Sequence, residues 1–310
     1  MKQVTIFFFL LLVITAKFSF SQLLPPGSWK ADIAALPANR IIANNETLWF
    51  STPYGIFSLQ KTDKVFEVFN KTNGLSEALP SAIAALPNGK LIVGYSNGNI
   101  DMVNEWVVTN IPGLKNYPSP SEKKINSIYI NNETAFLATD IGVVAVDLST
   151  NSIKSTAFTG ANGSTEKVYA ITSFKDSIAA ITESGLKMIS VHDNFPDYNH
   201  WQLTVTGNFK YMANDENTLI LAGENEVYTY NGITAEPAYL TPYKINSISV
   251  YQNKIILTEY HALQSRLTQL PTTTYSATYI QNEYIKHPLD AFMGQEGIWV
   301  ADSVTGISLH

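Results

Sequence analysis

Seven short apolar runs recur along the chain, and each is followed by a polar turn and a second apolar run. The pattern is clear in TLWFSTPYGIFSL at 47–59, KLIVGYSNGNIDMV at 90–103 and TAFLATDIGVVAVDL at 134–148. It returns at 177–191, 218–230, 254–267 and 298–309. Successive turns are 36 to 44 residues apart, and most of them contain glycine. A repeat of about forty residues built from strands is typical of the blades of a β-propeller.

Each repeat also contains an inner and an outer run with the character of strands. The clearest inner runs precede the phrase at 40–45, 125–132, 168–174 and 245–253. The outer runs follow it at 65–70, 105–111, 153–159, 200–205, 235–240 and 274–280. These runs are rich in Val, Ile, Thr and aromatic residues and are bounded by Asn, Gly, Asp and Pro. Because nothing after residue 21 has helical periodicity, the pattern predicts four-stranded blades and an all-β fold.

The seven phrases are followed by only six outer strands, because the last phrase ends at Leu309, next to His310. The segment Trp29–Ile33 precedes the first blade and has no partner of its own. We therefore expect it to pair with Gly306–Leu309 and to supply the missing strand, which removes the exposed edges of a linear array. The alternative is an N-terminal coil with a truncated last blade. The prediction is a seven-bladed β-propeller over 22–310, closed by an N-terminal strand.

The first 21 residues are predicted to be a secretory signal peptide. Lys2 gives a positive start, Ile6–Ala16 is almost entirely apolar, and cleavage is expected before Gln22. This run is shorter than the roughly 20 apolar residues needed to span a bilayer, and no later stretch is longer. The absence of cysteine excludes disulfide bonds, so an exported chain of this kind depends on its own core.

The charge of the chain argues against nucleic acid as a partner. The formal net charge is −6, and it becomes more negative when Lys2 and Lys17 leave with the signal peptide. Proteins that bind nucleic acid carry clustered basic surface instead. The low proportion of charged residues, 15%, together with many Asn, Ser and Thr residues, suits a hydrated polar exterior.

The turns between the second and third strands of the blades emerge on one face of a propeller, together with the loops that join successive blades. The ring of such turns includes Tyr54, Tyr95, Asn97, Asp140, Glu183, Glu224, Glu259, His261 and Asp302. The longest connecting loop is 112–124, which carries Tyr117, Lys123 and Lys124. The candidate binding residues are Tyr54, Tyr95, Asn97, Lys123, Lys124, Asp140 and Glu183. For Asn97–Gly98 and Ser184–Gly185, the competing interpretation is turn geometry, in which glycine supplies a positive φ.

No catalytic, metal or cofactor site is predicted. Residues 94–98 match the G-x-S-x-G nucleophile elbow, but that motif needs a strand running into a helix, and Ser96 lies between two strands. The five histidines have no metal-ligand spacing, and there is no cysteine to complete a zinc cluster. The acidic turn residues either gather to bind a cation or form a solvated rim. A lyase or hydrolase that uses Glu183, Glu259 and His261 is the third functional hypothesis.

The sequence resembles two protein families. Trp49–Ile56 resembles the W-I-G-T-x-x-G-L repeat of propellers in two-component regulators. From about residue 26 to its end, the chain is similar to the N-terminal propeller of the PorZ family, which belongs to the type IX secretion system of Bacteroidetes. The segments that carry the similarity are 28–30, 71–76, 91–101, 125–129 and 160–164.

The PorZ resemblance implies a non-enzymatic exported protein at the outer membrane surface or in the periplasm. It implies anionic lipopolysaccharide or another glycan as ligand and proteins of the surface sortase complex as partners, but it supplies no binding residues. PorZ-like proteins continue into a second propeller and a sorting domain, so we expect this chain to be part of a longer gene product or a separate binding module. The resemblance to regulators implies the alternative function, an extracytoplasmic sensor propeller.

Overall fold

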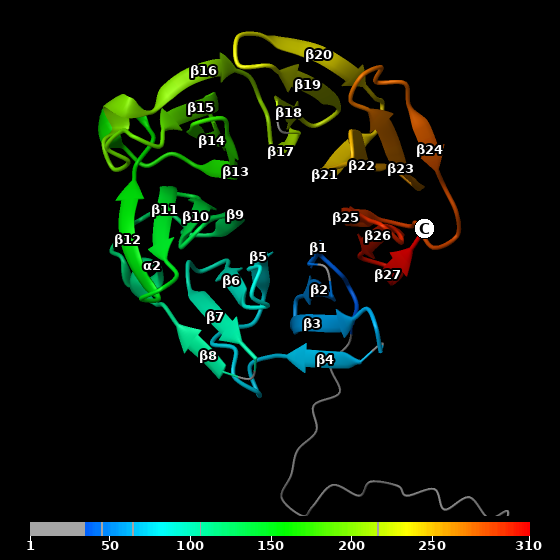
Figure 1. Ribbon diagram of the computed structural model, residues 1–310, viewed down its shortest axis with the longest axis horizontal. Helices are drawn as coiled ribbons and strands as arrows, with labels where there is room; N and C mark the ends of the chain where they lie inside the picture. Colours follow the sequence, from blue (N-terminus) through cyan, green and yellow to red (C-terminus); the bar gives the residue numbers. More distant parts are fainter. Residues whose placement is uncertain (1–34, 45, 64, 106, 216) are drawn as a thin grey trace, which may run out of the picture. The chain divides into compact units, whose positions relative to one another are not determined.

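The computed structural model of the chain describes residues 35–310 except 45, 64, 106 and 216, and these belong to one compact unit. Seven antiparallel sheets stand around a central channel in the order of the sequence (Figure 1). This arrangement confirms the predicted seven-bladed, all-β propeller. The predicted signal peptide and the predicted closing strand Trp29–Ile33 lie outside the described residues, so both remain predictions.

Each blade runs outward from the channel as strands a, b, c and d. The a strands are β1 Arg40–Ala43, β5 Pro80–Ala85, β9 Ile125–Asn131, β13 Val168–Phe174, β17 Tyr211–Asp215, β21 Lys244–Tyr251 and β25 Pro288–Gly294. The b strands are β2 Thr47–Thr52, β6 Leu91–Tyr95, β10 Thr134–Thr139, β14 Ser177–Thr182, β18 Thr218–Ala222, β22 Lys254–His261 and β26 Gly297–Asp302.

The c strands are β3 Gly55–Gln60, β7 Ile100–Asn104, β11 Gly142–Asp147, β15 Gly185–Ser190, β19 Glu226–Tyr230, β23 Gln264–Pro271 and β27 Gly306–Leu309. The d strands are β4 Phe66–Phe69, β8 Val107–Asn110, β12 Ser152–Ala157, β16 Gln202–Thr206, β20 Ala235–Leu240 and β24 Thr278–Ile280. Six sheets have four strands, and blade 7 has three among the described residues. Helical structure is limited in the described part to single turns: α2 Gly113–Asn116 and the 3-10 turns Ala161–Gly163 and Tyr198–His200.

The apolar runs in the sequence arise because each b strand is buried on both faces. In β6, Leu91 and Val93 pack into the core between blades 1 and 2, and Ile92 packs into the core between blades 2 and 3. Successive side chains of a strand point to opposite faces, so a strand between two neighbouring sheets is apolar over most of its length. Each interface between adjacent blades holds one apolar cluster.

Blade 7 packs against blade 1, and this contact closes the ring. Strand β1 contacts β25 and β26, as the other a strands contact their neighbours. The amide of Ala38 donates to the carbonyl of Asp302 at 3.3 Å. A shared core that includes Phe50 and Trp299 fills the interface. The ring is therefore closed by side-chain packing in the part of the chain that the structure describes.

A β-bulge at the start of the a strand links several blades to the next one. In β5, β9 and β21 the residue in the bulge points its side chain at the following blade, as bulged residues often do. Ser81 donates to the carbonyl of Ile125 at 2.7 Å, Asn126 to that of Val168 at 2.8 Å, and Asn246 to that of Pro288 at 2.9 Å. The same contact recurs at the channel wall in these three blades. It fixes the start of strand a in the next blade.

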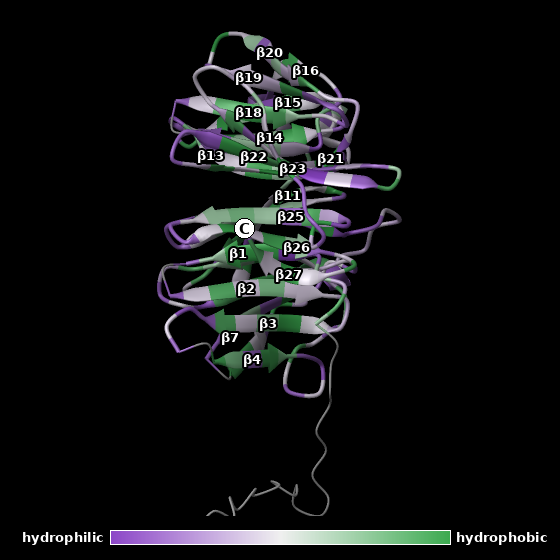
Figure 2. Ribbon diagram, turned by 90° about the vertical axis from the view of Figure 1, so that its right-hand side faces the viewer, coloured by the Kyte–Doolittle hydropathy of each residue, from purple (hydrophilic) through white to green (hydrophobic). Residues whose placement is uncertain are grey.

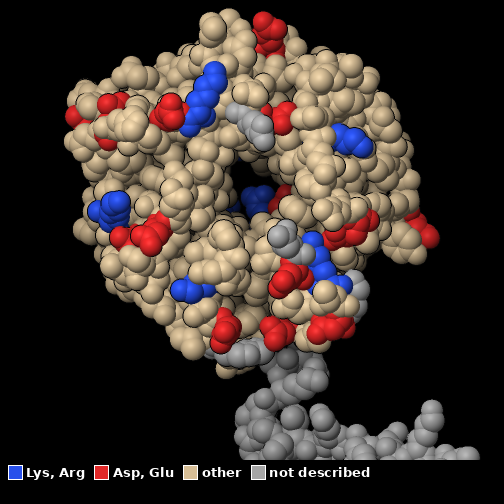
Figure 3. All heavy atoms as spheres, in the orientation of Figure 1, with Lys and Arg blue, Asp and Glu red and all other residues tan. Residues whose placement is uncertain are grey.

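The ring has two faces, which we name by their turns. The b–c face carries the b–c turns and the loops from d to the next a strand, and the a–b face carries the a–b and c–d turns. Figure 2 shows apolar strand centres between two polar rims. Figure 3 views the ring from the a–b face.

Candidate functional site

The predicted binding residues lie at or near the b–c face, but they differ in exposure. Tyr54, Asn97 and Glu183 are exposed at the tips of b–c turns, as expected. Asp140 is half-buried, because its carboxylate accepts from Asn126 at 2.9 Å and pairs with Lys167 at 3.1 Å. These positions remain candidates for ligand contact.

The prediction that the Tyr95 side chain belongs to the exposed ring is wrong. It is the last residue of β6, only 1% exposed, and its hydroxyl donates to Asp101 at 2.8 Å. Burial and the Asp101 carboxylate raise the pKa of this hydroxyl, so it stays a donor. Tyr95 therefore stabilises blade 2 from within.

Lys123 and Lys124 are adjacent in the sequence but have different surroundings. The Lys123 ammonium group donates to the carbonyls of Lys115 and Tyr117, at 2.6 and 2.8 Å, and so holds the loop after β8. Lys124 is exposed and lines the channel, with Arg40 and Lys210 in the same cavity. Sequence reasoning missed Arg40, Lys167 and Lys210, although each stands at the start of an a strand.

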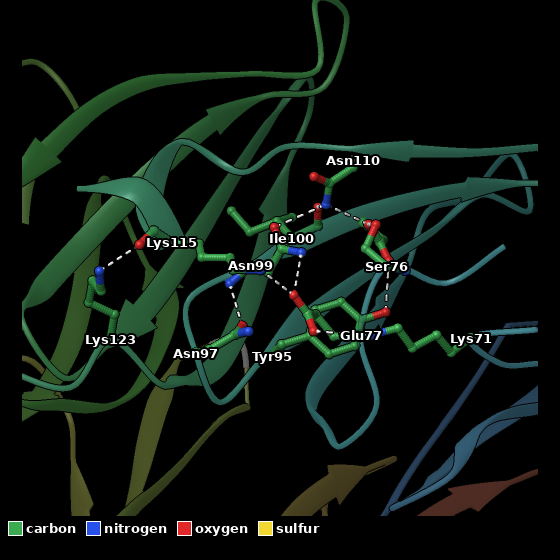
Figure 4. Close-up of polar contacts among 11 residues, drawn as sticks. Lys71, Ser76, Glu77, Tyr95, Asn97, Asn99, Ile100, Asn110, Lys115 and Lys123 are labelled. Atoms are coloured by element: carbon green, nitrogen blue, oxygen red, sulfur yellow. Dashed lines mark hydrogen bonds and ion pairs between the residues drawn. The ribbon is translucent and has the colours of Figure 1, made fainter.

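A buried polar network holds the b–c turn of blade 2 (Figure 4). The Asp101 carboxylate is fully buried. It accepts from the amide and hydroxyl of Ser76 at 2.7 Å each, and from Asn110 at 2.9 Å. These contacts join residues 71–76 and 91–101, two segments that carry the PorZ resemblance. The contacts of these two segments thus stabilise the blade.

Glu77 connects the same turn to the loop above it (Figure 4). Its carboxylate pairs with Lys115 on α2 and lies 3.9 Å from Lys71. The Lys115 ammonium group lowers the pKa of the Glu77 carboxyl. Gly98 has a φ of +84°, and a Cβ atom there would lie 2.9 Å from the Cβ of Lys123. The predicted positive φ at Gly98 is confirmed, and the turn also needs glycine for this close approach.

Two further acidic residues of the predicted rim are buried inside their blades. Glu259 is paired with Arg266 at 2.6 Å, and the guanidinium lies between the rings of Tyr243 and Tyr279, at 4.0 and 4.1 Å. Asp302 accepts from four amides, including those of Lys286 and His287. Both side chains are 0% exposed, so the prediction that they belong to a solvated or cation-binding rim is wrong.

The residues of the enzyme hypothesis have separate surroundings. Glu259 is buried with its arginine, whereas His261 is exposed at the end of β22 and its ring contacts Tyr243. Glu183 lies on the b–c turn of blade 4, and His261 lies in blade 6. Ser96 occupies the β6–β7 hairpin, as predicted. No group of three His, Asp or Glu side chains within the described ranges could hold a metal ion.

The chain was compared with known families. The profile of the TSS9, PorZ, N-terminal beta-propeller domain matches residues 48–202, which is half of the chain. The chain belongs to the PorZ N-terminal β-propeller family. The match covers blades 2 and 3 and most of blades 1 and 4, including the Asp101 network.

Solved structures show the same fold. PorZ, an essential bacterial surface component of the type-IX secretion system of Porphyromonas gingivalis, matches with a TM-score of 0.72 and 18% identity over 90% of this chain. The PorZ-family propeller spans 38% of that protein. The extracellular domain of the hybrid two component system BT4673 from B. thetaiotaomicron matches with a TM-score of 0.65 and 16% identity over 90% of this chain and 38% of its own length.

The WD40 propeller of Doa1 gives a TM-score of 0.64 and 10% identity over 88% of this chain and 91% of its own. At these identities the structures support the fold alone. No curated protein sequence matches the chain. No helix in the described part of the PorZ-family propeller combines the length and the apolar character needed to cross a membrane.

Proposed function

We propose that this propeller is a non-catalytic, exported binding module of type IX secretion, located at the outer membrane surface or in the periplasm. The observation that carries the proposal is the PorZ family match over residues 48–202, with a PorZ-like fold over 90% of the chain. The ligand is an anionic lipopolysaccharide or a related glycan, and the partners are proteins of the surface sortase complex.

The b–c face supports this proposal through its construction. Its loops are held by long-range contacts of buried carboxylates such as Asp101 and Asp302, so the face is rigid before a ligand arrives. Basic side chains surround the channel opening on this side, and Lys124 is one of them. A preorganised face with basic groups favours anionic ligands over neutral ones.

Deletion of the gene in its native host tests the proposal. We expect cargo proteins to reach the medium without being attached to the surface, as measured by fractionation and immunoblotting of a type IX cargo. Complementation with the intact gene is the control and restores attachment. Unchanged attachment in the deletion strain contradicts the proposal.

A sensor propeller is the second candidate, because the BT4673 extracellular domain has the same fold over 90% of this chain. Sequencing the genomic DNA beyond codon 310 separates the two candidates. A second propeller with a sorting domain in the same reading frame favours secretion. A membrane-spanning segment followed by a histidine kinase favours the sensor.

A further inference from the structure

Four basic side chains from four blades line the central channel. Arg40, Lys124, Lys167 and Lys210 border a cavity of about 420 Å³. A second cavity of about 380 Å³ towards the b–c face shares Arg40 and Lys124 with it. Figure 3 shows basic atoms inside the channel from the opposite side. Asp290 supplies the one carboxylate among the described residues that border these two cavities.

Two of these residues occupy the same backbone position of adjacent blades. Lys124 and Lys167 each directly precede an a strand, and their carbonyls accept from the amides of Asp140 and Glu183 at 3.1 and 3.2 Å. The sequence KINSI occurs at 124–128 and again at 244–248, and KVYAI occurs at 167–171. A basic residue before an a strand is therefore part of the repeat and not an accident of one loop.

Tyr169 fixes two of the ammonium groups. It is the bulged residue of β13, and its ring lies 3.7 Å from the Lys210 nitrogen and 5.5 Å from that of Lys167. Such contacts hold a cation at the face of an aromatic ring. Lys167 also pairs with Asp140, whereas Lys124 and Lys210 have no carboxylate within ion-pair distance in the described part of the chain. The Lys210 ammonium group is thus held near the channel without a counter-charge among the described residues, and Lys124 also lacks one.

Converging positive charges are unusual in a chain whose net charge is −6. Like charges repel, and low-dielectric walls strengthen the field in a cleft, so an anion that enters removes an unfavourable interaction. Asp290 offsets only part of the charge, because it is a single carboxylate beside four basic side chains. Burial raises the pKa of the Asp290 carboxyl, and the nearby Arg40 guanidinium opposes that shift.

We propose that the channel opening is an oxyanion site that binds the phosphate of a phosphorylated sugar. Arg40, Lys124 and Lys210 bind the phosphate, since guanidinium and ammonium groups are its usual partners. The ring of Tyr211, which borders the same cavity, packs on the sugar. This inference rests on the proposed function in one respect, namely that the b–c face is the ligand face.

Calorimetric titration of the full chain at low salt with glucose 1-phosphate, inorganic phosphate and glucose tests the site. Glucose 1-phosphate binds most tightly, inorganic phosphate binds more weakly, and glucose gives no heat. Lys124→Ala weakens binding of glucose 1-phosphate by about tenfold, since a charge-assisted contact is lost. Asp290→Asn strengthens it, because a negative charge leaves the cavity. Circular dichroism checks that both variants fold.

Lys244→Ala is the matched control. Lys244 begins the second copy of KINSI and is exposed, but it borders neither cavity. We expect its substitution to leave affinity unchanged. Equal weakening by Lys124→Ala and Lys244→Ala overturns the site, because it points to the general charge of the face. Inorganic phosphate binding as tightly as glucose 1-phosphate overturns the role of the sugar.

The outcomes also separate this site from the proposed function. Binding that depends on Lys124, together with normal cargo attachment in the deletion strain, supports the site and contradicts the function. Lost attachment in the deletion strain, with attachment fully restored by the Lys124→Ala gene and no binding of glucose 1-phosphate, supports the function and overturns the site.

Discussion

The b–c face and the a–b face each open onto a large cavity, and the two cavities carry opposite charge. On the b–c side the lining is basic, with Arg40 and Lys124. On the a–b side a larger cavity of about 820 Å³ lies between blades 1 and 2, and its charged residues are Glu46, Glu67 and Glu105. Figure 3 shows acidic groups spread over this second face. The a–b cavity has the larger volume. The charge of the lining nevertheless favours the channel as the place where an anionic ligand binds.

The faces also differ in how their loops are held. On the a–b face, side chains such as Asp147 and Asn231 bond to amides two or three residues away. On the b–c face, Asp101 accepts from Ser76, which is 25 residues earlier. Local turns can change without affecting the rest of a blade, whereas a long-range buried network orders a whole surface. In blade 2, the buried network therefore fixes the b–c side more firmly than local turn bonds fix the a–b side of the other blades.

Asp101→Ala should give the largest effect on this comparison. It leaves the buried Tyr95 hydroxyl and the half-buried amide and hydroxyl of Ser76 without their acceptor, and we expect the free energy of unfolding to fall by about 3 kcal/mol or more. Chemical denaturation followed by tryptophan fluorescence measures it. Asp147→Ala, on the a–b face, is the control and should change stability far less. Equal losses for the two variants would show that the faces are held alike.

Gly98→Ala should have a smaller effect that depends on the surroundings of the glycine. Its new Cβ atom would meet the Cβ and carbonyl of Lys123 at 2.9 and 3.0 Å, in addition to the strain of a positive φ. Gly89 lies in the a–b turn of the same blade with a φ of +82° and nothing within 4 Å. We expect Gly89→Ala to cost about 1 kcal/mol from φ alone, and Gly98→Ala to cost more. Thermal unfolding of both variants measures the difference, and a smaller loss for Gly98→Ala contradicts the packing of the loop.

Glu296, on the a–b face, should contribute a small pH dependence. Hydrogen bonds from Trp299 and then Lys61 lower the pKa of its carboxyl from 4.5 to about 2. Because the folded-state pKa is lowered, the ionised Glu296 carboxylate adds to the free energy of unfolding above pH 4.5. This contribution is lost as the pH falls towards 2. Glu296→Gln should flatten the decrease of the unfolding free energy between pH 5 and pH 2.5. Glu133→Gln on the same face serves as the control, and an identical pH profile for wild type and Glu296→Gln would refute the assignment.

The fold was predictable because its main signal is local. Burial on both faces makes the b strands apolar without interruption, and glycine marks the turn that follows. The a strands of blades 2, 5 and 7 were not delimited from the sequence, because strands such as Tyr211–Asp215 line the channel and are only half-buried. A mixed surface of this kind gives neither clear alternation nor an apolar run.

The candidate site was predictable only in part. Lys124 was selected because it ends the longest loop, but its partners Arg40 and Lys210 come from blades far away in the sequence. The signal was present in the repeated KINSI of 124–128 and 244–248, which places a lysine before the a strand. Tyr95 was misplaced because the residue at the end of a strand can point inwards or outwards. Only the contact with Asp101 decides this, and pairing across the hairpin is not visible in the local sequence.

The central claim is that the channel opening on the b–c face attracts oxyanions and the a–b cavity does not. Anomalous diffraction from crystals soaked in selenate tests it most directly, because selenium locates the anion without ambiguity. We predict a peak in the channel within hydrogen-bond distance of Lys124 or Lys210, which disappears in crystals of Lys124→Ala, Lys210→Ala. A channel without a peak, or a peak confined to the cavity lined by Glu46, Glu67 and Glu105, would contradict the account.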